Sequence, residues 1–286
     1  KLLEDPKVNP SVNENEAIIY AVTYGHLDIV NRLLEDTRVL SCDQHNRTIR
    51  IAAEYGRLDI VNRLLQDKCI DPSDKKNEAI IKAAENGHLD IVNRLLEDIR
   101  VNPSDQRNKA IIFAVYNGHL DIVNRLLKDS RVDPSVISIQ SVSRLDILNR
   151  LLEDPRVDPS KINNSAIIEA AKYGRSDIVN RLLEDPRVDP SFDDNKALVY
   201  ALKRGHKDIL RKLFGDIRVK VVMEYNNNNI KNVNIMLKDP TIKKYKLNKI
   251  IQKYYKNEYH KLIYIVKKLY NILPKEIIYT IMGLCR

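Results

Sequence analysis

The sequence predicts an all-α solenoid of helical repeats, and two recurring phrases support this fold class. The phrase LDIVNRLL, or a close variant of it, occurs seven times. Its aspartate marks the register, with a spacing of 31 residues that falls once to 25: Asp28, Asp59, Asp90, Asp121, Asp146, Asp177 and Asp208. A second phrase precedes it, as in NEAIIYAV from Asn15 and NEAIIKAA from Asn77. Neighbouring units of such an array bury apolar surface that one unit cannot bury alone.

The second phrase is expected to form the first helix of each unit. Ile18, Ala21 and Val22 fall at i, i+3 and i+4, on one helical face. We expect the leading asparagine to cap free N–H groups of the first turn, and a glycine to end the helix in the left-handed conformation. These residues are Asn15, Asn46, Asn77, Asn108, Asn164 and Asn195 at the start, and Gly25, Gly56, Gly87, Gly118, Gly174 and Gly205 at the end.

The LDIVNRLL phrase is expected to form the second helix, from about Leu27 to Glu35 in the first copy. There it should bury Ile29, Val30, Leu33 and Leu34. A following Asp-Pro or Asn-Pro pair ends the helix or forms the turn, because proline cannot continue the ladder of helical hydrogen bonds.

One unit is shorter than the others. Pro134 and Asp146 are 12 residues apart, where Pro103 and Asp121 are 18 apart. Residues 136–141 are β-branched residues, serines and one glutamine, mostly poor helix formers, and no capping glycine follows. We therefore predict an irregular segment that interrupts the binding groove between two sub-arrays, 1–133 and 146–216.

The residues AAENGHLDIV at 83–92, followed by Leu95 and Leu96, resemble the core of the ankyrin repeat. The resemblance implies an ankyrin-like array over residues 1–216, with a partial first unit, at least one helix upstream and a shortened unit near 134–145. The usual Thr-Pro-Leu-His start is replaced by Asn-x-Ala-Ile-Ile, and the repeat is shorter than the usual length of about 33 residues. The shorter repeat suggests a trimmed β-turn finger. This variant is similar to ankyrin proteins of large DNA viruses of amoebae.

Residues 217–286 differ in composition from the rest of the chain. They carry 15 Lys or Arg and 4 Asp or Glu, a net charge of +11, while residues 1–216 carry 33 and 35, a net charge of −2. Residues 233–240 align with 179–186, so we expect 217–270 to be degenerate repeats that cap the array. Eight tyrosines among these cations would also suit single-stranded nucleic acid. Codons rich in A and T produce the same composition, so nucleic acid is not the preferred partner.

The C-terminal residues 271–286 resemble the first helix of an F-box. The matching positions are Leu273, Pro274, Glu276, Ile277 and Ile281. Ankyrin proteins of poxviruses end in truncated segments of this kind, so the resemblance implies recruitment of a ubiquitin-ligase core subunit. The final leucine comes one position early, and a plain capping helix is the alternative interpretation.

Several repeated polar residues are expected to be structural. Acid–base pairs at i, i+4, such as Asp90 and Arg94, should form surface pairs of about 0.2–0.5 kcal/mol. The Glu-Asp pairs after the second helix should be solvated turn residues. The histidines that follow the capping glycine share their slot with Arg57 and Arg175, so we expect turn hydrogen bonds there and no metal site.

Aromatic residues on the first helices are the candidate partner-binding residues. In ankyrin-like folds these helices line a concave groove, and tyrosine is enriched at binding hot spots. The alternative is that the rings pack on the neighbouring turn. The candidates are Tyr20, Tyr24, Tyr55, Phe113, Tyr116, Tyr173 and Tyr200, together with Arg204.

No catalytic motif is present in the sequence: it has no phosphate-binding glycine loop, no nucleophile elbow and no zinc-protease helix. We expect a non-enzymatic monomer without cofactor that binds a partner protein. Three cysteines without ligand spacing favour a reducing compartment, hence the cytoplasm (the host's, if the protein is viral) or the nucleus. No apolar run is long enough for a membrane span.

Overall fold

The computed structural model describes residues 9–36, 39, 42–216 and 218–220. The predicted F-box-like segment and almost all of the predicted capping repeats lie outside these residues. The described residues form helices and no strand, which confirms the all-α class. The chain divides into two compact units, residues 1–137 with 142–157, and residues 138–141 with 158–286.

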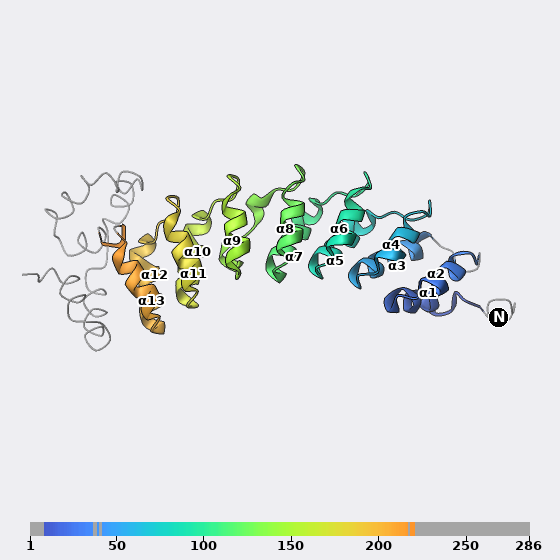
Figure 1. Cartoon of the computed structure of the whole chain (residues 1–286), viewed down its shortest axis with the longest axis horizontal. Coiled ribbons are helices and arrows are strands. Elements are labelled where there is room, and N and C mark those ends of the chain that lie inside the picture. Colours follow the sequence, from blue (N-terminus) through green and yellow to red (C-terminus); the bar gives the residue numbers. More distant parts are fainter. Residues whose placement is uncertain (1–8, 37–38, 40–41, 217, 221–286) are drawn as a thin grey trace, which may run out of the picture. The chain divides into compact units, whose positions relative to one another are not determined.

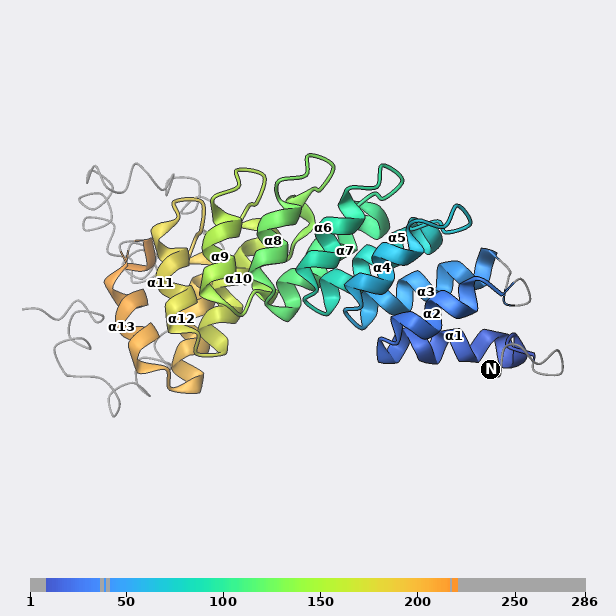
Figure 2. The same ribbon diagram turned by 45° about the vertical axis from the view of Figure 1, so that its right-hand side comes forward.

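The first unit is built from helix pairs that stack in sequence order (Figure 1). First helices pack on first helices, and second helices pack on second helices. Figure 2 shows the same order after rotation, with α1 and α2 at one end and α7 and α8 towards the other. The helices are α1 (Val12–Tyr24), α2 (Leu27–Leu34), α3 (Cys42–Glu54), α4 (Leu58–Leu64), α5 (Asp74–Glu85), α6 (Leu89–Leu96), α7 (Asp105–Asn117), α8 (Leu120–Leu126) and α9 (Leu145–Leu152).

The short repeat has no α-helix in its first half. A 3₁₀ turn, η3 (Pro134–Val136), packs on α7 within the first unit. The side chain of Asp133 caps it by accepting a hydrogen bond from the N–H of Ser135 at 2.9 Å.

The second unit contains a 3₁₀ turn and two helix pairs among its described residues. The turn η4 (Ile139–Ser141) packs on α10, and α10 packs on α12. The helices are α10 (Lys161–Lys172), α11 (Ser176–Glu184), α12 (Phe192–Arg204) and α13 (Lys207–Gly215).

The apolar stripes of both helices are buried as their periodicity predicts. Ile18 and Val22 of α1 are buried, and so are Ile60 and Leu64 of α4. The predicted burial of Ile29 in α2 is wrong, because its side chain is 50% exposed, and Leu34 is only half-buried. The equivalent isoleucines of α4, α6 and α8 are buried, and each of these helices packs on the second helix of the preceding repeat, whereas no second helix precedes α2 in the described part of the chain.

The glycine caps are confirmed, and they position the contact between neighbouring repeats. Gly56 and Gly87 have φ of 72° and 83°. The imidazole of His88 lies against Gly56, and its Nε2 is 3.0 Å from the carbonyl oxygen of Glu54 at the end of α3. A carbonyl only accepts, so Nε2 carries the proton. The predicted turn hydrogen bond of His88 therefore joins it to the preceding repeat. Arg57 occupies the same position one repeat earlier and donates to the carbonyl oxygen of Thr23 in the repeat before it.

The leading asparagines do not cap their helices as expected. Five first helices have a described N-terminus, and no side chain caps any of them: α1, α5, α7, α10 and α12. Instead, Asn77 is buried in the left-handed region at φ 63°, and its Oδ1 accepts the backbone N–H of Asn102 at 2.8 Å. Asn164 accepts the N–H of Asp189 at 2.6 Å in the same way. The side chain thus joins one repeat to the loop of the next, 25 residues later.

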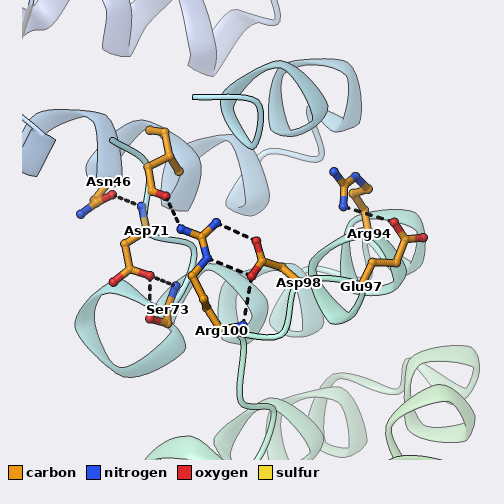
Figure 3. A network of polar contacts seen from close by, with 8 residues as sticks. Asn46, Asp71, Ser73, Arg94, Glu97, Asp98 and Arg100 are labelled. Atoms are coloured by element: carbon orange, nitrogen blue, oxygen red, sulfur yellow. Dashed lines mark hydrogen bonds and ion pairs between the residues drawn. The ribbon is translucent and has the colours of Figure 1, made fainter. Parts of the chain in front are cut away.

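An Asp-x-Arg clamp follows the second helices α6, α8, α9, α11 and α13, where the sequence predicted solvated acids. Figure 3 shows the clamp after α6. Arg100 donates to both carboxylate oxygens of Asp98, at 2.9 and 2.7 Å, and to the carbonyl of Ile70 in the preceding loop at 2.8 Å. The Asp98 side chain is 17% exposed. The same hydrogen bonds hold the pKa of Asp98 below its ordinary value. The expectation of solvated residues is wrong for the aspartate, because the arginine two residues later takes the place of water, and it holds for the glutamate, since the Glu97 side chain is 67% exposed.

The predicted i, i+4 pairs are also wrong for the four repeats from Asp59/Arg63 to Asp146/Arg150, where no such pair forms between described residues. Arg94 instead donates from Nε to Asn62 Oδ1 of the preceding repeat at 2.9 Å, and from Nη1 to Glu97 at 3.2 Å (Figure 3). Asn31, Asn93 and Asn124 accept from Arg63, Arg125 and Arg150 likewise. The arginine reaches across the stack because an amide acceptor lies there.

Candidate protein-binding surface

The tyrosines at the C-terminal ends of the first helices are exposed in the first unit. Tyr20 and Tyr24 of α1 are 52% and 64% exposed, while Ile18 and Val22 beside them are buried. The two rings lie one helical turn apart and stack, with centroids 6.3 Å apart and planes 12° apart. A hydrogen bond with Glu16 raises the pKa of Tyr20. Tyr55, which directly follows α3, is 50% exposed.

The helix α7 presents a second aromatic pair in the same unit. Tyr116 is 70% exposed, the largest value among these tyrosines. Phe113 is half-buried, and the ammonium of Lys109 lies 5.1 Å from its ring centroid. These positions expose apolar rings on rigid helices, which is the arrangement that protein-binding hot spots use.

The second unit joins its tyrosines to cations. Tyr173 at the end of α10 is 60% exposed, and Tyr200 of α12 is half-buried. Lys172 Nζ lies 4.9 Å from the centroid of Tyr173 and 5.7 Å from that of Tyr200. A hydrogen bond with Glu169 raises the pKa of Lys172. Arg204, the residue before the Gly205 cap, is exposed.

The described residues show no arrangement for metal chemistry or membrane insertion. They contain no cluster of three or more His, Cys, Asp or Glu side chains placed to hold a metal ion. Among the described helices, none combines the length and the hydropathy that a bilayer span requires.

Comparison with known proteins identifies the family. A model for ankyrin repeats in three copies matches residues 1–75, 49–138 and 136–223. The chain belongs to the ankyrin repeat family. Ankyrin repeats are generally scaffolds for protein–protein interaction.

Relatives of this ankyrin protein are distant. An ankyrin repeat family protein from Legionella pneumophila, known from its X-ray structure, is 21% identical, with 71% of this chain and 70% of that chain covered and a TM-score of 0.38. No curated protein matches the chain.

The structure places the predicted residues in two sets. Tyr20, Tyr24, Tyr55, Phe113 and Tyr116 belong to the first unit, and Tyr173, Tyr200 and Arg204 to the second. Of the cations beside Gly174 and Gly205, only Arg204 was predicted, although each glycine has at least two Lys or Arg residues within two positions. Leu273, Pro274, Glu276, Ile277 and Ile281 lie outside the described residues.

Proposed function

We propose that this ankyrin protein is a non-enzymatic scaffold that recognises a partner protein through the exposed faces of its first helices and the loops between repeats. The observation that carries the proposal is the exposure of the helix-end tyrosines. Tyr24 and Tyr116 expose 64% and 70% of their surface, while Ile18 and Ala21 of α1 and Ile111 and Ala114 of α7 are buried. Core packing therefore gives no reason for an aromatic ring at either position.

The inter-repeat bonds support the same proposal. The hydrogen bonds that join successive repeats come from residues such as Asn77, His88 and Arg100. The tyrosines are therefore not needed to hold the repeats together. Rigid helices carrying exposed rings lose little conformational entropy on binding, which favours a recognition surface over a catalytic one.

Affinity capture from extracts of the source cells, quantified by mass spectrometry, tests this function. Tyr24→Ala with Tyr116→Ala should reduce recovery of one defined protein, with a loss of roughly 1–3 kcal/mol for a hot-spot ring when the purified component is titrated. Asp90→Ala with Asp121→Ala is the matched control, because both side chains are exposed on second helices, which are not part of the proposed surface. Equal recovery by the tyrosine variant and the wild type would contradict the proposal.

A second candidate is a substrate adaptor for a ubiquitin ligase, acting in the cytoplasm or nucleus of a virus-infected host. It rests on the F-box-like residues Leu273, Pro274, Glu276, Ile277 and Ile281. Leu273→Asp or Glu276→Lys should then abolish capture of a ligase core subunit while the helical content stays unchanged. Retention of that subunit after deletion of residues 271–286 would refute the adaptor role. We propose that the protein acts as a monomer in either case.

A further inference from the structure

We infer that the turns of the second unit form a docking surface for an acidic peptide segment of the partner protein. The surface, called the basic turn surface, consists of Lys172, Tyr173, Arg175, Lys203, Arg204 and Lys207. The inference rests on the proposed function, and it names the chemistry of the partner.

These residues gather around two neighbouring turns. Gly174 ends the α10 helix and Gly205 ends α12, both with positive φ. The imidazole of His206 bridges the two turns: its Nε2 lies 3.2 Å from the carbonyl of Lys172, and its ring lies against Gly174. Residues two positions either side of each glycine are therefore brought together.

The composition of these turns differs from that of the first unit. The four turns around Gly25, Gly56, Gly87 and Gly118 contain one cation, Arg57, and two acids, Glu54 and Glu85. Arg57 is occupied with the carbonyl of Thr23. The two turns of the second unit contain five cations and no acid: Lys172, Arg175, Lys203, Arg204 and Lys207.

Three of these cations have no acidic partner among the described residues. Lys203, Arg204 and Lys207 are exposed, and none is in an ion pair with a described residue. Cations also stabilise a helix C-terminus through the macrodipole. That need does not explain the cluster, because α1 and α7 have no basic residue in their last turns. Unneutralised charge on one surface raises the association rate and the selectivity for a partner of opposite charge.

A peptide fits this surface better than a nucleic acid. Lys172 lies over the rings of both Tyr173 and Tyr200, and Arg175 lies 5.8 Å from the centroid of Tyr173. Nucleic-acid binding through aromatics needs open ring faces on which bases stack. A carboxylate instead accepts two parallel hydrogen bonds from one guanidinium group. The side chain of Arg204, which carries such a group, is exposed.

The test uses the full chain and a short fluorescein-labelled peptide of alternating glutamate and aspartate, followed by fluorescence anisotropy. Lys203→Glu with Arg204→Glu should weaken binding by about tenfold, and the affinity of the wild type should fall as salt is added. Lys68→Glu with Lys128→Glu is the control: both lysines are exposed in the first unit, and the net charge changes equally. Circular dichroism confirms that each variant is folded.

Equal weakening by the two double variants, or no binding by the wild type, would overturn the inference. Tighter binding of a single-stranded oligonucleotide of equal charge at the same ionic strength would also overturn it and would favour nucleic acid. The proposed function is tested separately. A partner that still depends on Tyr24 and Tyr116, but lacks affinity for the basic turn surface, would sink this inference and leave the scaffold standing.

Discussion

The buried asparagine bridge offers a direct test of how the repeats are held together. Asn164 is 7% exposed, has φ of 55°, and accepts the N–H of Asp189 at 2.6 Å. Alanine at this position removes the acceptor, which costs about 1–3 kcal/mol when the donor is left without a partner. A left-handed alanine adds about 1–2 kcal/mol. We therefore expect Asn164→Ala to destabilise the protein by about 2–5 kcal/mol.

The neighbouring residue provides the matched control. Asn163 has φ of 57° and is exposed, and its side chain makes no hydrogen bond to another described residue. Asn163→Ala should therefore cost only the left-handed term of about 1–2 kcal/mol. Urea unfolding followed by circular dichroism measures both variants. Hydrogen exchange adds a local readout, because the Asp189 amide should lose protection only in Asn164→Ala.

Equal destabilisation by the two variants would refute this account of the bridge. Unchanged protection of the Asp189 amide in Asn164→Ala would refute it as well, even if the protein were less stable.

Three further predictions concern other inter-repeat contacts. Asn180 Oδ1 is buried and has no hydrogen-bond partner among the described residues, and Lys212 occupies the position where other repeats have arginine. Lys212→Arg should therefore raise the free energy of unfolding by about 1 kcal/mol, while Lys207→Arg should not change it. Gly56→Ala places a Cβ 2.6 Å from the His88 ring, whereas no atom of the described part of the chain lies within 4 Å of a Cβ at Gly205. Gly56→Ala should lower Tm more than Gly205→Ala, and equal losses would contradict the packing argument. The Arg131 hydrogen bonds hold the pKa of Asp129 below its ordinary value, so this stabilisation is present above the ordinary aspartate pKa of about 3.9 and is lost as pH falls through the lower folded value. Tm measured against pH should therefore fall less in Asp129→Asn than in the wild type, and parallel curves would contradict this.

Local features of the fold could be predicted because the same residues recur at the same positions in several repeats. The glycine caps and the buried faces follow from the spacing of residues such as Gly25, Ile18 and Val22 within one helix. The bridges could not be predicted from local rules, because Asn164 meets its partner 25 residues away and Arg94 meets Asn62 in the preceding repeat. A local rule supplied the wrong partner in each case, a helix cap for the asparagine and an i+4 acid for the arginine.

In the candidate surface, too, positions within one helix could be predicted and contacts between repeats could not. The aromatic positions could be picked out because Tyr24 and Tyr116 interrupt a pattern of alanine, isoleucine and valine. Of the cations of the basic turn surface, only Arg204 was predicted. The grouping itself could not be, since Lys172 and Arg204 are 32 residues apart in the chain and meet only when the turn at Gly205 packs on the turn at Gly174.

Site-specific photo-crosslinking tests the central claim, recognition of a partner protein through the first helices, most directly. A benzophenone amino acid placed at Tyr116, which is 70% exposed on α7, would be compared with the same group at Asp121, which is exposed on the second helix α8. In extracts of the source cells, the account predicts one defined crosslinked protein from position 116 and none from position 121. A crosslink from position 121 alone, or the same crosslinks from both positions, would contradict it.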